Sequence, residues 1–116
     1  MRDVRSAAAG GNTCAQLALD VHAHRLRAQI AAMAAALGGL DTLVFTGGIG
    51  EHQARARAEA AAGLAFLGVA LDRDRNDSAR ADCDISAAGA AVRTLVITAR
   101  EDIEIARQTR AALAAE

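Results

Sequence analysis

The sequence contains no proline, no tryptophan and no tyrosine, and only two phenylalanines among its 116 residues. Although 53% of the residues are hydrophobic, much of that fraction is alanine, which buries little apolar area per residue. A core of such residues can be dense, but each contributes modestly, so we expect marginal stability for the chain alone, improved by a partner chain or domain. The length suits one domain or a piece of a larger one.

Neither sign of charge dominates, because the chain has 13 basic and 14 acidic residues and a net charge of −1. This balance gives no basic stripe for nucleic acid and no polybasic patch for a membrane surface. The first residues lack the apolar core of a signal peptide, and no uncharged stretch suits a membrane span. Cys14 and Cys83 lie far apart without other metal ligands nearby, which is typical of reduced thiols. We expect a soluble, cytoplasmic protein.

Helix-like and strand-like segments alternate along the chain. A helix is predicted to begin at Asn12 or Thr13 and to end near Leu37, where two glycines follow. Further helices are predicted at about 51–62 and 101–114, and strands at 42–46, 66–71 and 92–98. The polar segment 72–90 is predicted to be a loop. The pattern indicates an α/β fold with a small sheet of about three strands, whose edges need covering by something else.

A glycine cluster, GGIG at 47–50, follows the first predicted strand. Glycines there allow positive φ angles and let another group approach the backbone without an intervening Cβ. Ligands of open α/β sheets tend to bind beyond the carboxyl ends of the strands, where a following helix suits a phosphate. The spacing matches neither the dinucleotide-binding fingerprint nor the P-loop. The local pattern therefore leaves two interpretations open: a ligand site, or a turn that only fits a strand against a helix.

The longer stretch DTLVFTGGIGEH, at 41–52, resembles the carboxy-terminal part of the acetate kinase family, in which a hydrophobic strand precedes FT(A/G)GIGEN. Other blocks agree in order and spacing: AQLALDVHAHRLR at 15–27, GLAFLGVALD at 63–72, RNDSAR at 75–80, DIS at 84–86 and VRTLVITAREDIEIARQT at 92–109. The resemblance covers nearly the whole chain, but only the last part of the family's usual length.

This resemblance implies part of an actin-like ATPase fold, of the ribonuclease H-like sugar kinase and Hsp70 superfamily, with residues 1–116 forming most of the carboxy-terminal, nucleotide-side lobe. It implies reversible transfer of the γ-phosphoryl group of ATP to acetate, giving acetyl phosphate and ADP, with Mg²⁺ as cofactor. Propionate and butyrate kinases share the pattern, so the acyl acceptor is not specified. The family's catalytic groups lie earlier in its sequence. We therefore expect no catalytic residue here and an inactive isolated chain, which is either a fragment of a split or truncated gene or a segment that works with a separate amino-terminal lobe.

The family's nucleotide-binding residues can be carried over one at a time. Arg2 corresponds to the arginine of a D-x-R motif that contacts the nucleotide. The adenosine-binding GIGEN turn corresponds to Gly48, Ile49, Gly50, Glu51 and His52. His52 stands where asparagine is usual; a histidine still donates and accepts hydrogen bonds, but its shape differs. These six residues form the predicted adenine-nucleotide site.

Glu101 corresponds to a glutamate that the family associates with Mg²⁺. Thr98 and Glu101 also have the spacing of a capping box, in which Glu101 satisfies a backbone N–H at the start of the last helix. One carboxylate alone is a weak magnesium site. Both roles stay open, and they do not exclude each other.

Three functional hypotheses follow from the resemblance. The chain is the nucleotide-side portion of an acetate kinase, a nucleotide-binding remnant without catalysis, or a structural module. The third hypothesis rests on the family's carboxy-terminal lobe, which also forms its homodimer interface, so we expect a homo-oligomer.

Overall fold

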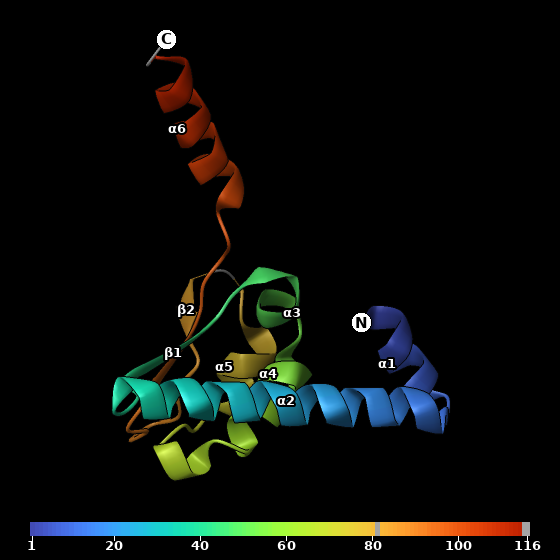
Figure 1. The fold of residues 1–116 in the computed structure, drawn as a ribbon. Helices are drawn as coiled ribbons and strands as arrows, with labels where there is room; N and C mark the ends of the chain where they lie inside the picture. Colours follow the sequence, from blue (N-terminus) through green and yellow to red (C-terminus); the bar gives the residue numbers. More distant parts are fainter. Residues whose placement is uncertain (81, 115–116) are drawn as a thin grey trace.

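The computed structural model describes residues 1–80 and 82–114. Their helices and strands follow one another in a mixed order (Figure 1). In sequence they are α1 (Arg2–Ala9), α2 (Thr13–Leu37), β1 (Thr42–Phe45), α3 (Gly47–His52), α4 (Ala54–Ala62), the 3₁₀ helix η1 (Ala65–Leu67), α5 (Arg73–Ser78), β2 (Cys83–Asp84), β3 (Arg93–Val96) and α6 (Glu101–Leu113).

The long helix α2 begins and ends as the sequence predicts. Asn12 is its N-cap, and the side-chain Oδ1 accepts a hydrogen bond from the N–H of Ala15 at 2.9 Å. Gly38 follows the last residue in a left-handed conformation. Before it, the short helix α1 was not predicted; it folds back over the first part of α2 (Figure 1). This arrangement brings the first residues of the chain toward α3 and α4.

The sheet has the strand order β1-β3-β2, with β1 parallel to β3 and β2 antiparallel to it. Three strands were expected, and three form, but the predicted strand at 66–71 is wrong. Its first part is the 3₁₀ helix η1, and Gly68, with φ of 89°, interrupts the extended backbone before two isolated bridges at Val69 and Leu71. The third strand comes from Cys83–Asp84 instead.

The predicted loop at 72–90 is also partly wrong, because it contains helix α5 as well as β2. Asp72 is the N-cap of α5, and its Oδ1 accepts from the N–H of Arg75 at 2.9 Å. An aspartate in that position stabilises the start of a helix, so the charged sequence DRDRND encodes a capped helix.

The core lies between the sheet and α4. Leu64, Ile85, Val92 and Val96 are almost fully buried there. The alanines of α4 pack against them, and partly buried residues of α2, such as Leu26, close one side. Burying a leucine, isoleucine or valine contributes about 1.5–3 kcal/mol, so this cluster holds the sheet and α4 together.

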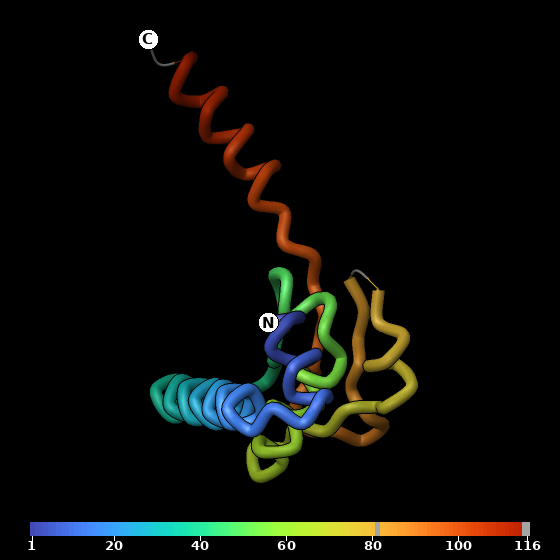
Figure 2. The backbone as a smooth tube through the Cα atoms, turned by 90° about the vertical axis from the view of Figure 1, so that its right-hand side faces the viewer, coloured from blue at the N-terminus to red at the C-terminus, as the bar shows by residue number. Residues whose placement is uncertain are grey.

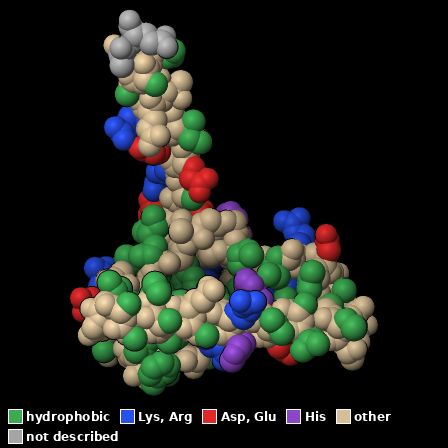
Figure 3. Space-filling view, in the orientation of Figure 1, with side chains coloured by type: hydrophobic (Ala, Val, Ile, Leu, Met, Phe, Trp, Pro, Cys, Tyr) green, Lys and Arg blue, Asp and Glu red, His purple; other side chains and the backbone are tan. Residues whose placement is uncertain are grey.

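Helix α6 projects from this body, and Figure 2, turned by 90°, shows the same separation. Each described residue of α6 is exposed, including Ile103 at 61% and Ile105 at 64%. The space-filling view shows charged side chains along its lower half and hydrophobic side chains scattered over the body (Figure 3). Among the described residues, no helix is both long and apolar enough to cross a membrane.

Candidate functional site

The glycine cluster lies at the end of β1 and forms a helix of its own. Thr46 is extended, Gly47 has φ of 72°, and α3 runs from Gly47 to His52. The predicted helix start at residue 51 is therefore wrong, since α3 and α4 are separate and Gln53 interrupts them.

Two of the glycines differ in what surrounds them. A Cβ on Gly50 would lie 3.1 Å from the carbonyl carbon of Phe45, so a side chain there would press on the end of β1. A Cβ on Gly48 would meet nothing within 4 Å. Gly50 is therefore needed for the fit of α3 against the strand, whereas Gly48 leaves bare backbone open to another molecule.

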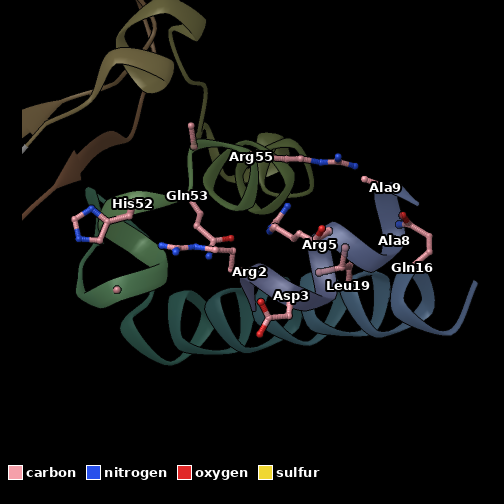
Figure 4. Close-up of a pocket in the computed structure, with 13 residues that line it drawn as sticks. Arg2, Asp3, Arg5, Ala8, Ala9, Gln16, Leu19, His52, Gln53 and Arg55 are labelled. Atoms are coloured by element: carbon pink, nitrogen blue, oxygen red, sulfur yellow. The ribbon is translucent and has the colours of Figure 1, made fainter. Parts of the chain in front are cut away.

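Gly48 lines a cleft of about 1080 Å³ formed by α1, α2, α3 and α4. Arg2 and His52 line it too, although Arg2 and Gly48 are distant in the sequence. Figure 4 shows the Arg2 side chain extending from α1 toward His52 and Gln53. The fold thus brings together three of the six residues of the predicted nucleotide site.

The cleft is rich in positive charge, because Arg2, Arg5 and Arg55 all line it. Arg55 Nε donates to Glu59 Oε1 at 2.7 Å, and Arg5 Nη2 lies 3.8 Å from Glu59 Oε2. Arg5 Nε and Nη1 are buried and have no hydrogen-bond partner among the described residues. Buried donors without partners are costly.

Sequence reasoning missed Arg5 and Arg55 as cleft residues. A signal for Arg5 was present, since it follows Arg2 by three residues and therefore lies on the same side of α1. That spacing has a meaning only on a helix, and the sequence patterns do not predict α1.

The other predicted nucleotide-site residues do not line this cleft. Ile49 and Gly50 line a smaller, largely apolar cavity of about 320 Å³ next to Phe45 and Leu26. The Glu51 side chain is held by hydrogen bonds from the backbone. Its Oε1 accepts from the N–H of Gly47 and from that of Ala99, both at 2.8 Å. The glycine turn thus separates a polar cleft from an apolar cavity.

Glu101 is the first residue of α6 and is exposed. The capping box is wrong, because the N-cap is Arg100 and no side chain caps the helix. Thr98 lies before the cap, where its N–H donates to Asp82 Oδ1 at 3.0 Å. Arg100 pairs with the same aspartate, and their hydrogen bond lowers the pKa of Asp82.

A metal site needs several oxygen, nitrogen or sulfur ligands. The described residues contain no group of three or more histidine, cysteine, aspartate or glutamate side chains placed to hold a metal ion. Glu101 therefore belongs to no such group within the described part of the chain.

Known proteins share both the sequence and the fold. The model of the acetokinase family matches residues 1–107. An acetate kinase from Gloeobacter violaceus is 56% identical over 98 residues, which are 84% of this chain and 24% of that protein. The Porphyromonas gingivalis acetate kinase structure matches 97% of this chain and 28% of its own, at 34% identity and a TM-score of 0.85. A propionate kinase structure from Francisella tularensis matches 90% of this chain and 26% of its own, at 34% identity and a TM-score of 0.79.

These matches agree in extent, since the chain spans about a quarter of the length of the relatives. They also bear out the α/β architecture, a mixed three-stranded sheet with helices that corresponds to part of the solved acetate kinase structures. The chain belongs to the acetokinase family.

Proposed function

We propose that the chain supplies part of the adenine-nucleotide site of an acetate kinase-like enzyme. The enzyme would transfer the γ-phosphoryl group of ATP to acetate and run the reaction in reverse to make ATP. The observation that carries this proposal is the meeting of Arg2, Gly48 and His52 at one cleft. Family resemblance assigns all three positions to nucleotide binding.

The chemistry of the cleft fits ATP or ADP. Gly48 lets the flat face of a base or sugar lie against the backbone, because no Cβ stands in the way. His52 can donate or accept a hydrogen bond to the nucleoside. The positive charges of Arg2, Arg5 and Arg55 suit phosphate oxygens, which form strong charge-assisted hydrogen bonds with guanidinium groups. In this proposal these side chains bind and orient the nucleotide, and the groups that act on the transferring phosphoryl come from elsewhere in the enzyme.

The chain offers fewer groups to bind Mg²⁺ than to bind the nucleotide. Mg²⁺ commonly keeps several waters and binds through one or two carboxylates together with substrate phosphates. We propose that Glu101 is one such carboxylate in the assembled enzyme, with the remaining ligands coming from ATP, water and the rest of the protein. When bound, the ion would neutralise charge on the transferring phosphoryl group.

The catalytic groups belong to a separate amino-terminal lobe in this proposal. Phosphoryl transfer depends on positioning and charge neutralisation around the transferring group, and a cleft of three arginines provides only part of that. The projecting, fully exposed α6 supports a partner lobe, because it presents Ile103 and Ile105 away from the body.

A second candidate function is assembly without catalysis. Large apolar side chains on α2 are exposed, among them Leu17 at 62% and Leu37 at 77%. Contiguous exposed apolar side chains mark interaction surfaces, and Met33, at 61%, lies one turn before Leu37, in agreement with the homodimer expected from the family.

Calorimetric titration of the chain with ADP and with ATP, with and without Mg²⁺, tests the nucleotide proposal. We expect saturable binding that Arg2→Ala and Gly48→Val weaken. Arg73→Ala is the matched control, because Arg73 lies on α5, outside the cleft, with 91% of its side chain exposed. Adding the amino-terminal lobe of a relative should then give acetyl phosphate formation.

The possible outcomes separate the hypotheses. Binding without turnover in the presence of the added lobe would indicate a nucleotide-binding remnant. Absence of binding at millimolar nucleotide, with the lobe present, would reject the nucleotide site and leave the assembly function.

A further inference from the structure

The side chain of Arg57, on α4, is buried without a carboxylate partner among the described residues. Only 2% of the residue is exposed, and its guanidinium donates to four uncharged oxygens. Nη1 donates to the carbonyls of Gly50 at 2.8 Å and Glu51 at 2.9 Å. Nε and Nη2 donate to Oδ1 and the backbone carbonyl of Asn76 at 2.8 and 2.6 Å.

Burial of a charge in this way is unfavourable, and it lowers the pKa of Arg57. Replacing the arginine by an apolar residue would avoid that cost. The sequence instead keeps a group whose planar fork satisfies several acceptors in fixed directions. Two of these acceptors are carbonyls of α3, whose last carbonyls have no partner within such a short helix.

Asn76 completes the arrangement from α5. It is 2% exposed, and its Nδ2 donates to the carbonyl of Ala54 at 2.9 Å. Arg57 and Asn76, which we call the Arg57–Asn76 clamp, therefore tie together α3, the start of α4 and α5. The clamp is separate from the cleft, because neither residue lines it.

Helix α3 has six residues, three of them glycine, and is unstable without contacts from the rest of the protein. Glycine costs about 1 kcal/mol per helical position relative to alanine, and helices this short are unstable without external contacts. In α3 such contacts come from side chains at both ends. Glu51 Oε1 accepts from the N–H of Gly47 at the start, and Arg57 binds the carbonyls of Gly50 and Glu51 near the end.

We propose that Arg57 and Asn76 are positioning residues for the nucleotide site: the clamp fixes α3 so that Gly48 and His52 present one defined surface to the cleft. This inference rests on the proposed nucleotide-binding function. Neither residue touches the ligand; both act through the backbone of the glycine turn.

The variant Arg57→Lys tests the clamp without any nucleotide. Lysine keeps the positive charge but is a point charge on a flexible chain, so it cannot reach all four acceptors in the same geometry. We expect α3 amides to exchange with deuterium at least about tenfold faster, because local opening becomes easier when these bonds are lost. Amides in the middle of α2 should keep their exchange rates.

Nucleotide affinity provides the second readout. We expect the dissociation constant for ADP to rise about tenfold or more in Arg57→Lys, measured well below the melting temperature. Ile85→Val is the stability control, since Ile85 is fully buried in the core and lies outside the cleft lining. It should lower the melting temperature but leave ADP affinity unchanged. Arg73→Lys, at an exposed arginine of α5, should change neither.

Asn76→Ala keeps the test decisive where Arg57→Lys fails to fold. It removes one of the four acceptors, the Oδ1 that binds Nε, and leaves the backbone carbonyl in place. Its effects on exchange and on affinity should be in the same direction as those of Arg57→Lys and smaller.

Three results would overturn the positioning role. One is unchanged exchange in α3 in both variants. Another is faster exchange with unaltered ADP affinity, and the third is a loss of affinity no larger than in Ile85→Val at an equal loss of stability. Absence of ADP binding by the unaltered chain, alone and with the amino-terminal lobe, would instead reject the proposed function. Exchange in α3 would then still decide whether the clamp holds the turn.

Discussion

Glu51 and Ala99, 48 residues apart in the sequence, are joined by a hydrogen bond of 2.8 Å from the Ala99 N–H to the Glu51 carboxylate. The same oxygen, Oε1, accepts from Gly47 at the start of α3. Because Gly47 follows β1 and Ala99 follows β3, one carboxylate connects the ends of two neighbouring parallel strands. The glutamate of the GIGE sequence thus has a structural reason to follow the glycines, whatever ligand the turn binds.

Replacing Glu51 should separate its structural contribution from a ligand contact. Glu51→Ala leaves two backbone N–H groups without their acceptor, and we expect unfolding to become easier by about 1–3 kcal/mol. Glu51→Gln keeps a carbonyl oxygen and should lose less than half of that. Urea unfolding followed by circular dichroism measures both. Should Glu51→Gln keep its stability and yet lose ADP affinity, the carboxylate contacts the nucleotide directly.

Gly48 and Gly50 form a matched pair with opposite expected effects. Gly50→Ala should destabilise the fold by about 1–3 kcal/mol, since its methyl group would press on the backbone of Phe45. Gly48→Ala should leave stability unchanged or slightly raised, because alanine favours helix and the position is open. Thermal unfolding measures this difference, and equal losses for the two variants would contradict it.

Nucleotide titration of Gly48→Ala adds a direct test of the cleft. If a base or sugar lies against bare backbone at Gly48, a methyl group there should weaken ADP binding in a protein of normal stability. Normal affinity would place the ligand elsewhere in the cleft.

The sequence predicted best those elements that are set by local signals. Helix α2 follows from Asn12, a run of helix-forming residues and Gly38, and it has those bounds in the structure. The parallel strands β1 and β3 follow from short apolar runs, although burial alternates along β1, where Val44 is 47% exposed. Such segments carry enough information in a few consecutive residues to define their own limits.

The parts that were not predicted depend on contacts distant in the sequence. The segment around Phe66 has strand-like composition, yet Gly68 and the packing of Leu64 make it a 3₁₀ turn. Arg57 looks like a solvated charge in an alanine-rich helix, and only the position of Asn76 on α5 makes its burial possible. Asn76 itself lies in the RNDSAR block that resembles the family, which was the one sequence signal for the clamp.

Resemblance to a family names candidate site residues but not their arrangement. It named Arg2, Gly48 and His52, which meet at the cleft, together with Ile49 and Gly50, which line the neighbouring cavity. The motif residues are consecutive in the sequence, but on a helix consecutive side chains lie on different faces. In α3 one face therefore meets the cleft and another meets the apolar cavity. Which side of α3 meets the cleft depends on how α1 folds over α2, and short-range patterns do not contain that information.

Asp84 should make stability depend on pH in the acid range. Hydrogen bonds from Ser86 and the guanidinium of Arg93 lower the pKa of Asp84 from 3.8 to about 2. Because the folded pKa is depressed, the stabilisation is fully present above pH 3.8 and is lost as the pH falls toward 2. Asp84→Asn should therefore be less stable than the unaltered chain at pH 6, and the difference should shrink between pH 4 and about 2.

Arg93, the ion-pair partner of Asp84, gives an internal control for this pH dependence. Ser86 contributes most to the lowered pKa and Arg93 less, so Arg93→Gln should retain most of the acid-range slope. Urea midpoints measured from pH 6 down to about 2.5 decide the matter. A stability difference between Asp84→Asn and the unaltered chain that stays constant over this range would mean that Asp84 does not titrate as described.

Helix α6 should matter for association and not for the stability of the body. Ile105 is 64% exposed, and Leu113, on the same side two turns further along, is 69% exposed. Ile105→Asn should therefore change the unfolding free energy of the isolated chain by less than about 0.5 kcal/mol, as exposed substitutions usually do. If α6 binds the amino-terminal lobe through this side, the same variant should weaken that association at least about tenfold, because a buried polar amide would replace an apolar contact.

Titration of the lobe by calorimetry measures the affinity of this association. Gln108→Ala is the matched control, because Gln108 lies on the polar side of α6, where its side chain donates a hydrogen bond to Glu104. A loss of stability in the isolated chain would show that α6 packs on its own body in solution, and unchanged association would place the lobe contact outside this side of the helix.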